Sequence, residues 1–292
     1  MKKKHNPVLL RFTLLFSLAW MLLPLKADAA SITSLSPTRP GSAYRVSMDC
    51  DLDGDNSIEK LGVYYTQKDY YTDNIYLSVN GNNALVLDVS GKWCYAPKVN
   101  VVNSDNGNAC IQIICHTDND YTAFNQLFRY DSISNTFSLL LELHSGITKA
   151  CQEVSKATSN GFIVKNRYQP CEIGWTSWNY TYVWTDGVPI LQSTKNAVAG
   201  SIFKKNKFTT DKKITFYKTP GGKKKAFTIK RGKKVTLKYM SLTPKYMYAG
   251  FKYGKKIGWL RIDRDYGKVY KWDKKKNKSR GYFKNVAERL VG

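Results

Sequence analysis

Hairpin turns recur at a regular spacing in this 292-residue chain. Asn80-Gly81 lies between two segments of alternating apolar residues, and Asn-Gly is the strongest short-range signal for a two-residue hairpin turn. Further turns are expected at 131–135 and at Asp186-Gly187, so turns near residues 81, 134 and 187 are about 53 residues apart. One more apolar strand is expected before each turn, at residues 61–66, 110–115 and 161–164. The sequence therefore predicts a unit of three or four antiparallel strands that occurs three times.

Two all-β arrangements of these units fit the pattern. Repeated antiparallel units of this size are typical of propeller-like blades, but three units are fewer than a closed ring usually has. The same hairpin spacing also fits an ordinary antiparallel sandwich. We therefore expect an all-β domain over residues 30–200, with either a propeller-like or a sandwich arrangement.

Charge divides the chain into three parts. Residues 1–29 hold five basic and one acidic residue, residues 30–200 hold 12 and 16, and residues 201–292 hold 29 and five. The last part thus has a net charge of +24, and small and polar residues at 195–201 mark its expected boundary. At 42% hydrophobic residues the chain has enough apolar material for packed domains, which excludes wholesale disorder.

The first 29 residues have the pattern of a secretory signal peptide. Three lysines at 2–4 precede an apolar run at 12–23, and Ala27-Asp28-Ala29 supplies small residues at the cleavage-determining positions. The run is shorter than the ~20 residues that a membrane-spanning helix needs. We expect cleavage after Ala29 or Ala30, a secreted protein, and no transmembrane span in the mature chain.

All the cysteines of the chain fall in the expected all-β domain: Cys50, Cys94, Cys110, Cys115, Cys151 and Cys171. An even number of cysteines in an exported protein indicates disulfide bonds, although the sequence does not fix their pairing. Proximity in sequence gives only weak guidance towards Cys110–Cys115 and Cys151–Cys171. Zinc is the alternative, but the chain has no Cys-x-x-Cys pair and only His116 and His144 after cleavage, so disulfides are favoured.

One short segment concentrates oxygen ligands, at Asp51, Asp53, Asp55, Ser57 and Glu59. Its four carboxylates, with the carbonyl group of Ser57, can converge on one hard cation, and Gly54 and Asn56 permit the tight turns. Ligation by oxygen alone suits Ca²⁺. A solvated acidic turn is the alternative, but bare carboxylates at this density would repel one another. We therefore predict a calcium site with a structural role.

Asp51–Glu59 together with the following Lys60-Leu-Gly-Val-Tyr-Tyr resembles the opening of the FG-GAP/VCBS-type repeats. The resemblance covers about 40 residues, and it implies calcium-binding loops within propeller blades. Asn56 stands where those repeats usually have Gly. The second unit has only Asn103-Ser-Asp105-Asn-Gly107-Asn108 at the matching place, and this degenerate loop is not expected to bind metal.

The basic part has the signals of five short strands, at 214–217, 226–229, 235–239, 246–251 and 256–262, which suits a small β-barrel. Three motifs in it are Ile214-Thr-Phe-Tyr217-Lys-Thr-Pro-Gly-Gly, Lys230-Arg-Gly-Lys-Lys-Val235 and Gly254-Lys-Lys-Ile-Gly-Trp259-Leu. They resemble the bacterial SH3 (SH3b) domain over roughly residues 208–265. The resemblance implies extracellular attachment, often to peptidoglycan, and no catalysis. We thus expect a basic SH3b-like domain with a basic tail over 201–292.

The predicted ligand-binding residues combine positive charge with aromatic rings: Tyr217, Lys223, Lys224, Lys225, Lys233, Lys234, Tyr248, Tyr253 and Trp259. Lysines act as point charges on polyanions, whereas arginines favour shape-specific contacts, so a Lys-dominated surface indicates loose attraction. The rings could stack on sugars or bases. Alternatively, the lysines form a solvated surface and about half of the aromatic residues belong to the core.

These features predict a secreted, non-catalytic binding protein. Its SH3b-like domain would attach to peptidoglycan or teichoic-acid-type polyanions at the wall of a Gram-positive bacterium, and the all-β domain would bind another, unknown ligand. A cell-wall hydrolase or transpeptidase is the first alternative, with His144 and Cys151 or His116 and Cys115 as possible nucleophile pairs. Extracellular nucleic-acid binding is the second, since phosphates attract any such surface. The sequence does not fix the oligomeric state.

Overall fold

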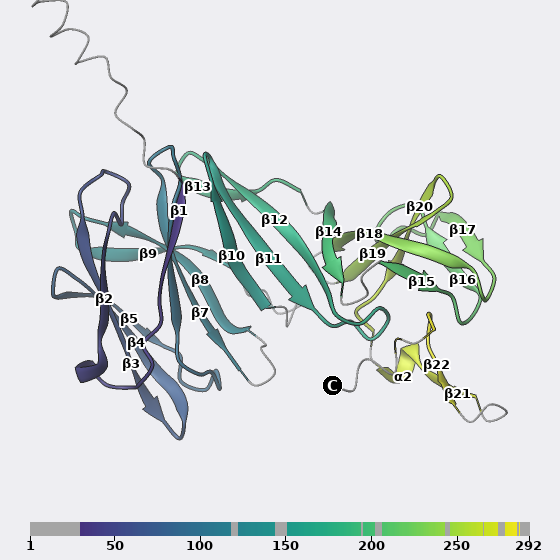
Figure 1. Cartoon of the computed structure of the whole chain (residues 1–292), viewed down its shortest axis with the longest axis horizontal. Coiled ribbons are helices and arrows are strands. Elements are labelled where there is room, and N and C mark those ends of the chain that lie inside the picture. The colour runs from purple at the N-terminus through teal and green to yellow at the C-terminus, as the bar shows by residue number, and fades with distance from the viewer. Residues whose placement is uncertain are drawn as a thin grey trace, which may run out of the picture.

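The computed structural model describes residues 30–117, 122–143, 151–193, 195–201, 206–242, 246–264, 266–273, 278–284 and 286. These residues form antiparallel sheets, which confirms the all-β prediction (Figure 1). The predicted signal peptide lies outside the described residues. The part of the chain that is described has no helix both long and apolar enough to span a membrane.

The first sheet is a four-stranded meander made of β2 (Val46–Cys50), β3 (Glu59–Lys68), β4 (Tyr71–Val79) and β5 (Asn82–Asp88). A short 3-10 helix, η1 (Ser42–Tyr44), precedes it. The predicted hairpin turn lies between β4 and β5, and Asn80 and Gly81 have the positive φ angles, 52° and 86°, that such a turn requires.

The second and third sheets repeat this pattern. The second contains β6 (Lys98–Asn103), β7 (Ala109–His116), β8 (Thr122–Asp131) and β9 (Thr136–Glu142), with β1 (Ser31–Leu35) added beside β6. The third begins with β10 (Cys151–Thr158), β11 (Gly161–Tyr168), β12 (Thr176–Thr185) and β13 (Val188–Leu191). The other two predicted hairpin turns thus join β8 to β9 and β12 to β13.

The three sheets pack face to face around β1, which contacts the first strand of each unit, β2, β6 and β10. Figure 1 shows them side by side, in chain order. The second sheet therefore buries both faces. Val101 and Ile111 pack against the first sheet, whereas Val102 and Cys110 pack in the core shared with the third sheet. Burial on both faces explains why β7 is a nearly continuous apolar strand.

A chain of buried amide groups joins the second and third sheets. Asn100 Nδ2 donates to Gln112 Oε1, and Gln112 Nε2 donates to Asn125 Oδ1, each over 2.8 Å. Across the interface, Asn125 Nδ2 donates to the carbonyl of Gln152 (2.6 Å), and the N–H of Val154 donates to Gln112 Oε1 (3.0 Å). Because buried amides must be paired, this network fixes how the two sheets meet.

The predicted domain boundary falls inside a strand. β14 (Lys195–Ser201) pairs with β12 through Thr176–Trp178 and with β18 through Tyr239–Ser241, so one sheet continues from the third unit into the basic part. The small and polar sequence at 195–201 marked the expected boundary between the two parts. Ladder hydrogen bonds come from the backbone, however, and do not require apolar side chains.

The basic part contains the five predicted strands and one more: β15 (Lys207–Thr209), β16 (Ile214–Tyr217), β17 (Lys225–Ile229), β18 (Lys234–Leu242), β19 (Met247–Tyr253) and β20 (Lys256–Arg261). Their order is β18-β19-β20-β16-β17, with β15 beside β18. Among the described strands this ladder stays open, so the small β-barrel predicted for this part does not close. The turn between β17 and β18 instead exchanges backbone hydrogen bonds with Thr210, at Gly232 and Lys233.

An aromatic core nevertheless makes the basic part compact. Phe251 lies at its centre, with ring centroids of Phe208, Phe216 and Phe283 at 5.9, 5.5 and 5.1 Å. Phe283 comes from the predicted basic tail, which also contains α2 (Tyr266–Val269), β21 (Lys271–Asp273) and β22 (Lys278–Arg280). The tail is therefore part of the fold.

Candidate functional site

The acidic loop between β2 and β3 brings together three of its five predicted metal ligands. Asp51, Asp53 and Glu59 each offer a carboxylate oxygen, and these oxygens lie within 4.8 Å of one another. Asp55 and Ser57 are exposed and outside this group, and the Asp55 carboxylate instead accepts the Ser57 N–H over 2.6 Å. The folded loop thus brings together three of the four predicted carboxylates.

The local sequence explains how the acidic loop turns. Gly54 and Asn56 have positive φ angles of 84° and 70°, as their residue types predicted. Both oxygens of Asp51 accept backbone hydrogen bonds, from Gly54 N–H (2.6 Å) and Asn56 N–H (3.0 Å). The loop is therefore wound around the Asp51 carboxylate.

Glu59 is the buried member of the cluster. Its Oε2 accepts the Leu52 N–H over 2.9 Å. Burial is the main cause that raises the pKa of the Glu59 carboxyl above its usual range, and the charges of Asp53 and Asp51 add to it. A cation between the three groups would relieve both effects, so the donor set fits a hard divalent ion such as Ca²⁺.

The loop at residues 103–108, which is not expected to bind metal, packs against the acidic loop. A Cβ atom placed on Gly54 would lie 1.7 Å from the carbonyl oxygen of Gly107, so the two loops touch through their backbones. Asn106 Nδ2 also donates to Asn160 Oδ1, which lies in the turn between β10 and β11 (2.7 Å). The loops of successive units therefore contact one another in order along the stack.

The predicted lysines of the basic part are all exposed and lie near turns. Lys223 and Lys224 are in the turn before β17, Lys225 begins β17, and Lys233 and Lys234 stand where β18 begins. The two sets thus lie at the two turns that flank β17. Thr236 at the start of β18 pairs with Lys252, and the ring of Phe227 in β17 lies 5.9 Å from that of Tyr253.

The predicted aromatic residues divide into two pairs. Tyr217 and Tyr253 are exposed, at 38% and 39%, and can meet a ligand. Tyr248 and Trp259 are only 8% and 5% exposed, so their prediction as stacking surfaces is wrong. The Trp259 ring stacks against Tyr239 with centroids 6.3 Å apart, because β20 lies inside the sheet.

Cys110 and Cys115 do not pair as their proximity in sequence suggested. Cys110 and Cys115 point into different cores, because residues five apart on one strand face opposite sides. The described residues contain no disulfide bond, but the thiols of Cys94 and Cys115 are in hydrogen-bond contact. The side chain of Cys151 lies outside the described residues.

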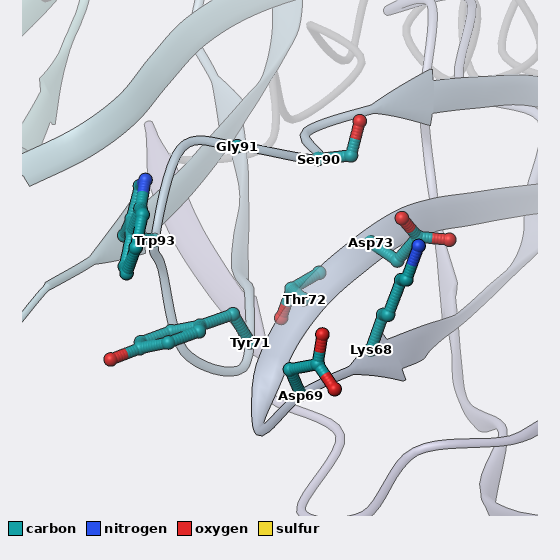
Figure 2. A pocket seen from close by; sticks show the side chains of 8 residues that line it. All are labelled: Lys68, Asp69, Tyr71, Thr72, Asp73, Ser90, Gly91 and Trp93. Carbon is teal, nitrogen blue, oxygen red and sulfur yellow. The ribbon is translucent and has the colours of Figure 1, made fainter.

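A pocket that the sequence did not indicate lies beside the β3–β4 turn. It has a volume of about 410 Å³ and is lined by Lys68, Asp69, Tyr71, Thr72, Asp73, Ser90, Gly91 and Trp93 (Figure 2). Its aromatic residues come from two separate segments. The only local signal was the Asp-Tyr-Tyr-Thr-Asp run at 69–73, in which two aromatic residues stand between acidic ones.

Comparisons with protein-family models, curated proteins and solved structures gave no match for this chain. The resemblances to the SH3b domain and to the FG-GAP/VCBS-type repeats therefore stay predictions.

Proposed function

We propose that this chain is a secreted, non-catalytic binding protein. Its basic part would attach to anionic envelope polymers such as teichoic acids, or to peptidoglycan, at the wall of a Gram-positive bacterium. The observation that carries the proposal is that the lysines at 223–225 and 233–234 are exposed at the two turns that flank β17. The ion pairs described in this part are Arg231–Asp211 and Arg261–Asp263, and neither involves these lysines. A cluster of lysines that is not neutralised attracts polyanions.

The described thiols favour a binding function over cysteine catalysis. A cysteine nucleophile needs an accessible thiolate. Cys115 is fully buried, and its contact with Cys94 together with burial raises the pKa of its thiol well above the usual value. His144 and the side chain of Cys151, the other pair considered, lie outside the described residues.

Charge removal at the turns tests the attachment. We expect Lys→Gln changes at 223, 224, 225, 233 and 234 to weaken binding of the full chain to purified teichoic acid by at least about tenfold at low salt. The dependence of affinity on salt should also become less steep, because fewer counterions are released. Titration calorimetry at two salt concentrations measures both effects.

A matched control removes the same charge elsewhere, by Lys→Gln at exposed positions 156, 165, 207, 213 and 238. It should change the affinity by less than about threefold. Equal loss in both variants would show that binding depends on diffuse charge and would contradict the proposed site. Competition between teichoic acid and double-stranded DNA distinguishes the wall ligand from nucleic acid.

We also propose that Asp51, Asp53 and Glu59 hold a structural Ca²⁺ ion. An ion bound only by the folded chain at about 100 times its Kd stabilises it by about 2.7 kcal/mol. Millimolar calcium should therefore raise the Tm by several degrees relative to chelator. Glu59→Gln should abolish this increase, whereas Asp186→Asn, an exposed change at another turn, should keep it. A wild-type Tm that is the same in calcium and in chelator would remove the calcium proposal.

Cys94 and Cys115 are the disulfide partners that we propose for the exported chain. Each thiol would lose a proton and an electron as the S–S bond forms, and the two electrons would reduce the disulfide of oxidised glutathione to two thiols. The bridge should stabilise the fold by about 2–4 kcal/mol. After refolding with oxidised glutathione, peptide mapping should find Cys94 joined to Cys115. Recovery of both as thiols or glutathione adducts would contradict the pairing.

A further inference from the structure

The pocket beside the β3–β4 turn has an aromatic rim that is open to solvent. Trp93 is 66% exposed, and the ring centroid of Tyr71 lies 5.4 Å from that of Trp93 and 5.8 Å from that of Tyr95. Tyr70, at the tip of the turn, is 88% exposed. Single exposed aromatic residues are ordinary, but several adjoining ones form a surface on which a flat, partly apolar ligand can stack.

The backbone holds these rings in place in unfavourable conformations. Asp69, Tyr70 and Trp93 have positive φ angles of 51°, 72° and 58°, and none of them is glycine. Such conformations cost on the order of 1 kcal/mol or more each and persist only where surrounding contacts enforce them. The rim is thus built by the fold, since local preference alone would not place these residues in this way.

Hydrogen bonds tie the Trp93 loop to the neighbouring strands. The N–H of Thr72 donates to the Cys94 carbonyl (2.8 Å), and its hydroxyl donates to the Tyr95 carbonyl (2.9 Å). The N–H of Tyr95 donates to the carbonyl of His116 over 2.8 Å, and Cys94 contacts Cys115. Because both residues next to Cys94 belong to the rim, the stacking surface is ordered before any ligand arrives.

Polar side chains face this surface across the pocket. Figure 2 shows the Lys68 ammonium group and the Asp73 carboxylate on the side opposite Trp93, with Asp69 below them and Ser90 above. Two aspartates and one lysine give this wall a net negative formal charge. Hydroxyl groups of a ligand could donate to the carboxylates and accept from the lysine, whereas phosphate groups would be repelled.

We propose that this pocket binds a neutral oligosaccharide. A pyranose ring presents C–H groups on its faces, which stack on aromatic rings, and hydroxyl groups at its edge, which exchange hydrogen bonds with carboxylates and ammonium groups. A nucleobase could stack on the same rim, but its phosphates would meet the negative wall. The site is separate from the lysine turns, so a test of sugar binding here is independent of the proposed attachment to polyanions.

Titration calorimetry of the full chain with cellotetraose, chitotetraose, maltotetraose and mannotetraose tests the assignment. We expect at least one of these sugars to bind. Trp93→Ala should weaken that binding by at least about tenfold, because a stacked aromatic residue contributes about 1.4 kcal/mol or more. Trp93→Phe should retain part of it, and Asp73→Asn should weaken it through the lost carboxylate.

Tyr44→Ala is the matched control, since Tyr44 is an exposed aromatic residue of the same region and lies outside the pocket. It should bind sugar as the wild type does. All variants should keep the wild-type Tm within about 2 °C, because the changes are at the surface. Absence of binding to all four sugars at millimolar concentration would overturn the proposal. So would wild-type affinity in Trp93→Ala, or a single-stranded oligonucleotide that binds through Trp93 in place of sugar.

Discussion

The three-sheet region (residues 30–193) and the basic region (residues 206–286) are built from the same antiparallel strands, but they place their polar groups differently. In the three-sheet region a network of buried amides around Gln112 is hydrogen-bonded, and the turns at Gly54 and Gly107 pack on each other. In the basic region the centre is a cluster of phenylalanines, and charge gathers on exposed turns. The packed turns at Gly54 and Gly107 should therefore support stability, whereas the exposed lysine turns of the basic region should support binding.

Replacing one turn glycine in each region tests this difference, because the loss in stability should be larger in the three-sheet region. Gly54 and Gly232 have similar φ angles of 84° and 81°, but a Cβ atom would meet the Gly107 backbone only at Gly54. We expect Gly54→Ala to destabilise the chain by about 3 kcal/mol or more, and Gly232→Ala by about 1 kcal/mol, which is the cost of the backbone conformation alone. Urea unfolding measures the two values, and equal losses would contradict the packed-turn interpretation.

The buried amide network around Gln112 should also contribute to the stability of the three-sheet region. Gln112→Leu keeps the volume of the side chain but removes its hydrogen bonds. The side-chain NH₂ of Asn100, the side-chain oxygen of Asn125 and the backbone N–H of Val154 then lose their partner. We expect a loss of about 2–3 kcal/mol, because unsatisfied buried groups cost more than a hydrogen bond contributes. The control Gln67→Leu changes an exposed glutamine of the same region and should cost less than about 0.5 kcal/mol. A Gln112→Leu protein as stable as the wild type would show that the network contributes little to stability.

A pH effect is expected where the two regions meet. Glu172 is fully buried, accepts the N–H of Arg264 over 3.3 Å, and its Oε2 has no hydrogen-bond partner among the described residues. Burial raises the pKa of its carboxyl from 4.5 to about 8, the Arg264 charge opposes this increase, and the Asp263 charge adds to it. The Lys212 ammonium group also interacts with this carboxyl.

The sign of this effect follows from proton binding. Between pH 4.5 and about 8 the folded chain holds the proton of Glu172 and the unfolded chain does not, so its contribution to stability is lost as the pH rises through this window. Glu172→Gln should remove that part of the pH dependence and have its smallest effect near pH 5. Unfolding free energies of both proteins at several pH values measure the difference. Parallel curves would show that Glu172 does not titrate in this window.

The turns of the fold could be predicted because their signals are local. Asn80-Gly81 and Asp186-Gly187 adopt the positive φ angles that their residue types favour, and the flanking alternation gives the strands. The Asp69-Tyr70 turn was missed because Tyr70, unlike Asp69, is not a residue type that favours a positive φ angle, and its conformation depends on the surrounding sheet. For the same reason the sequence did not show that the boundary expected at 195–201 lies within a strand, β14.

The candidate sites show the same division. The sequence identified Asp51, Asp53 and Glu59, because ligands close together in the chain stay close in space. It did not separate them from Asp55, since only the folded loop shows which carboxylates converge. The lysine turns were found from residues that are neighbours in the chain, whereas the pocket at Trp93 joins the segments 68–73 and 90–93 and became visible only in three dimensions.

Two tryptophans show which properties of a residue follow from its neighbours in the chain and which depend on the folded molecule. Strand positions, turn positions and the uneven charge follow from residues that are neighbours in the chain. Trp259 and Trp93 are the same residue type, yet Trp259 is 5% exposed inside a sheet and Trp93 is 66% exposed on a loop. Burial depends on which distant strands cover a side chain, and the residues near it in the sequence do not specify those strands.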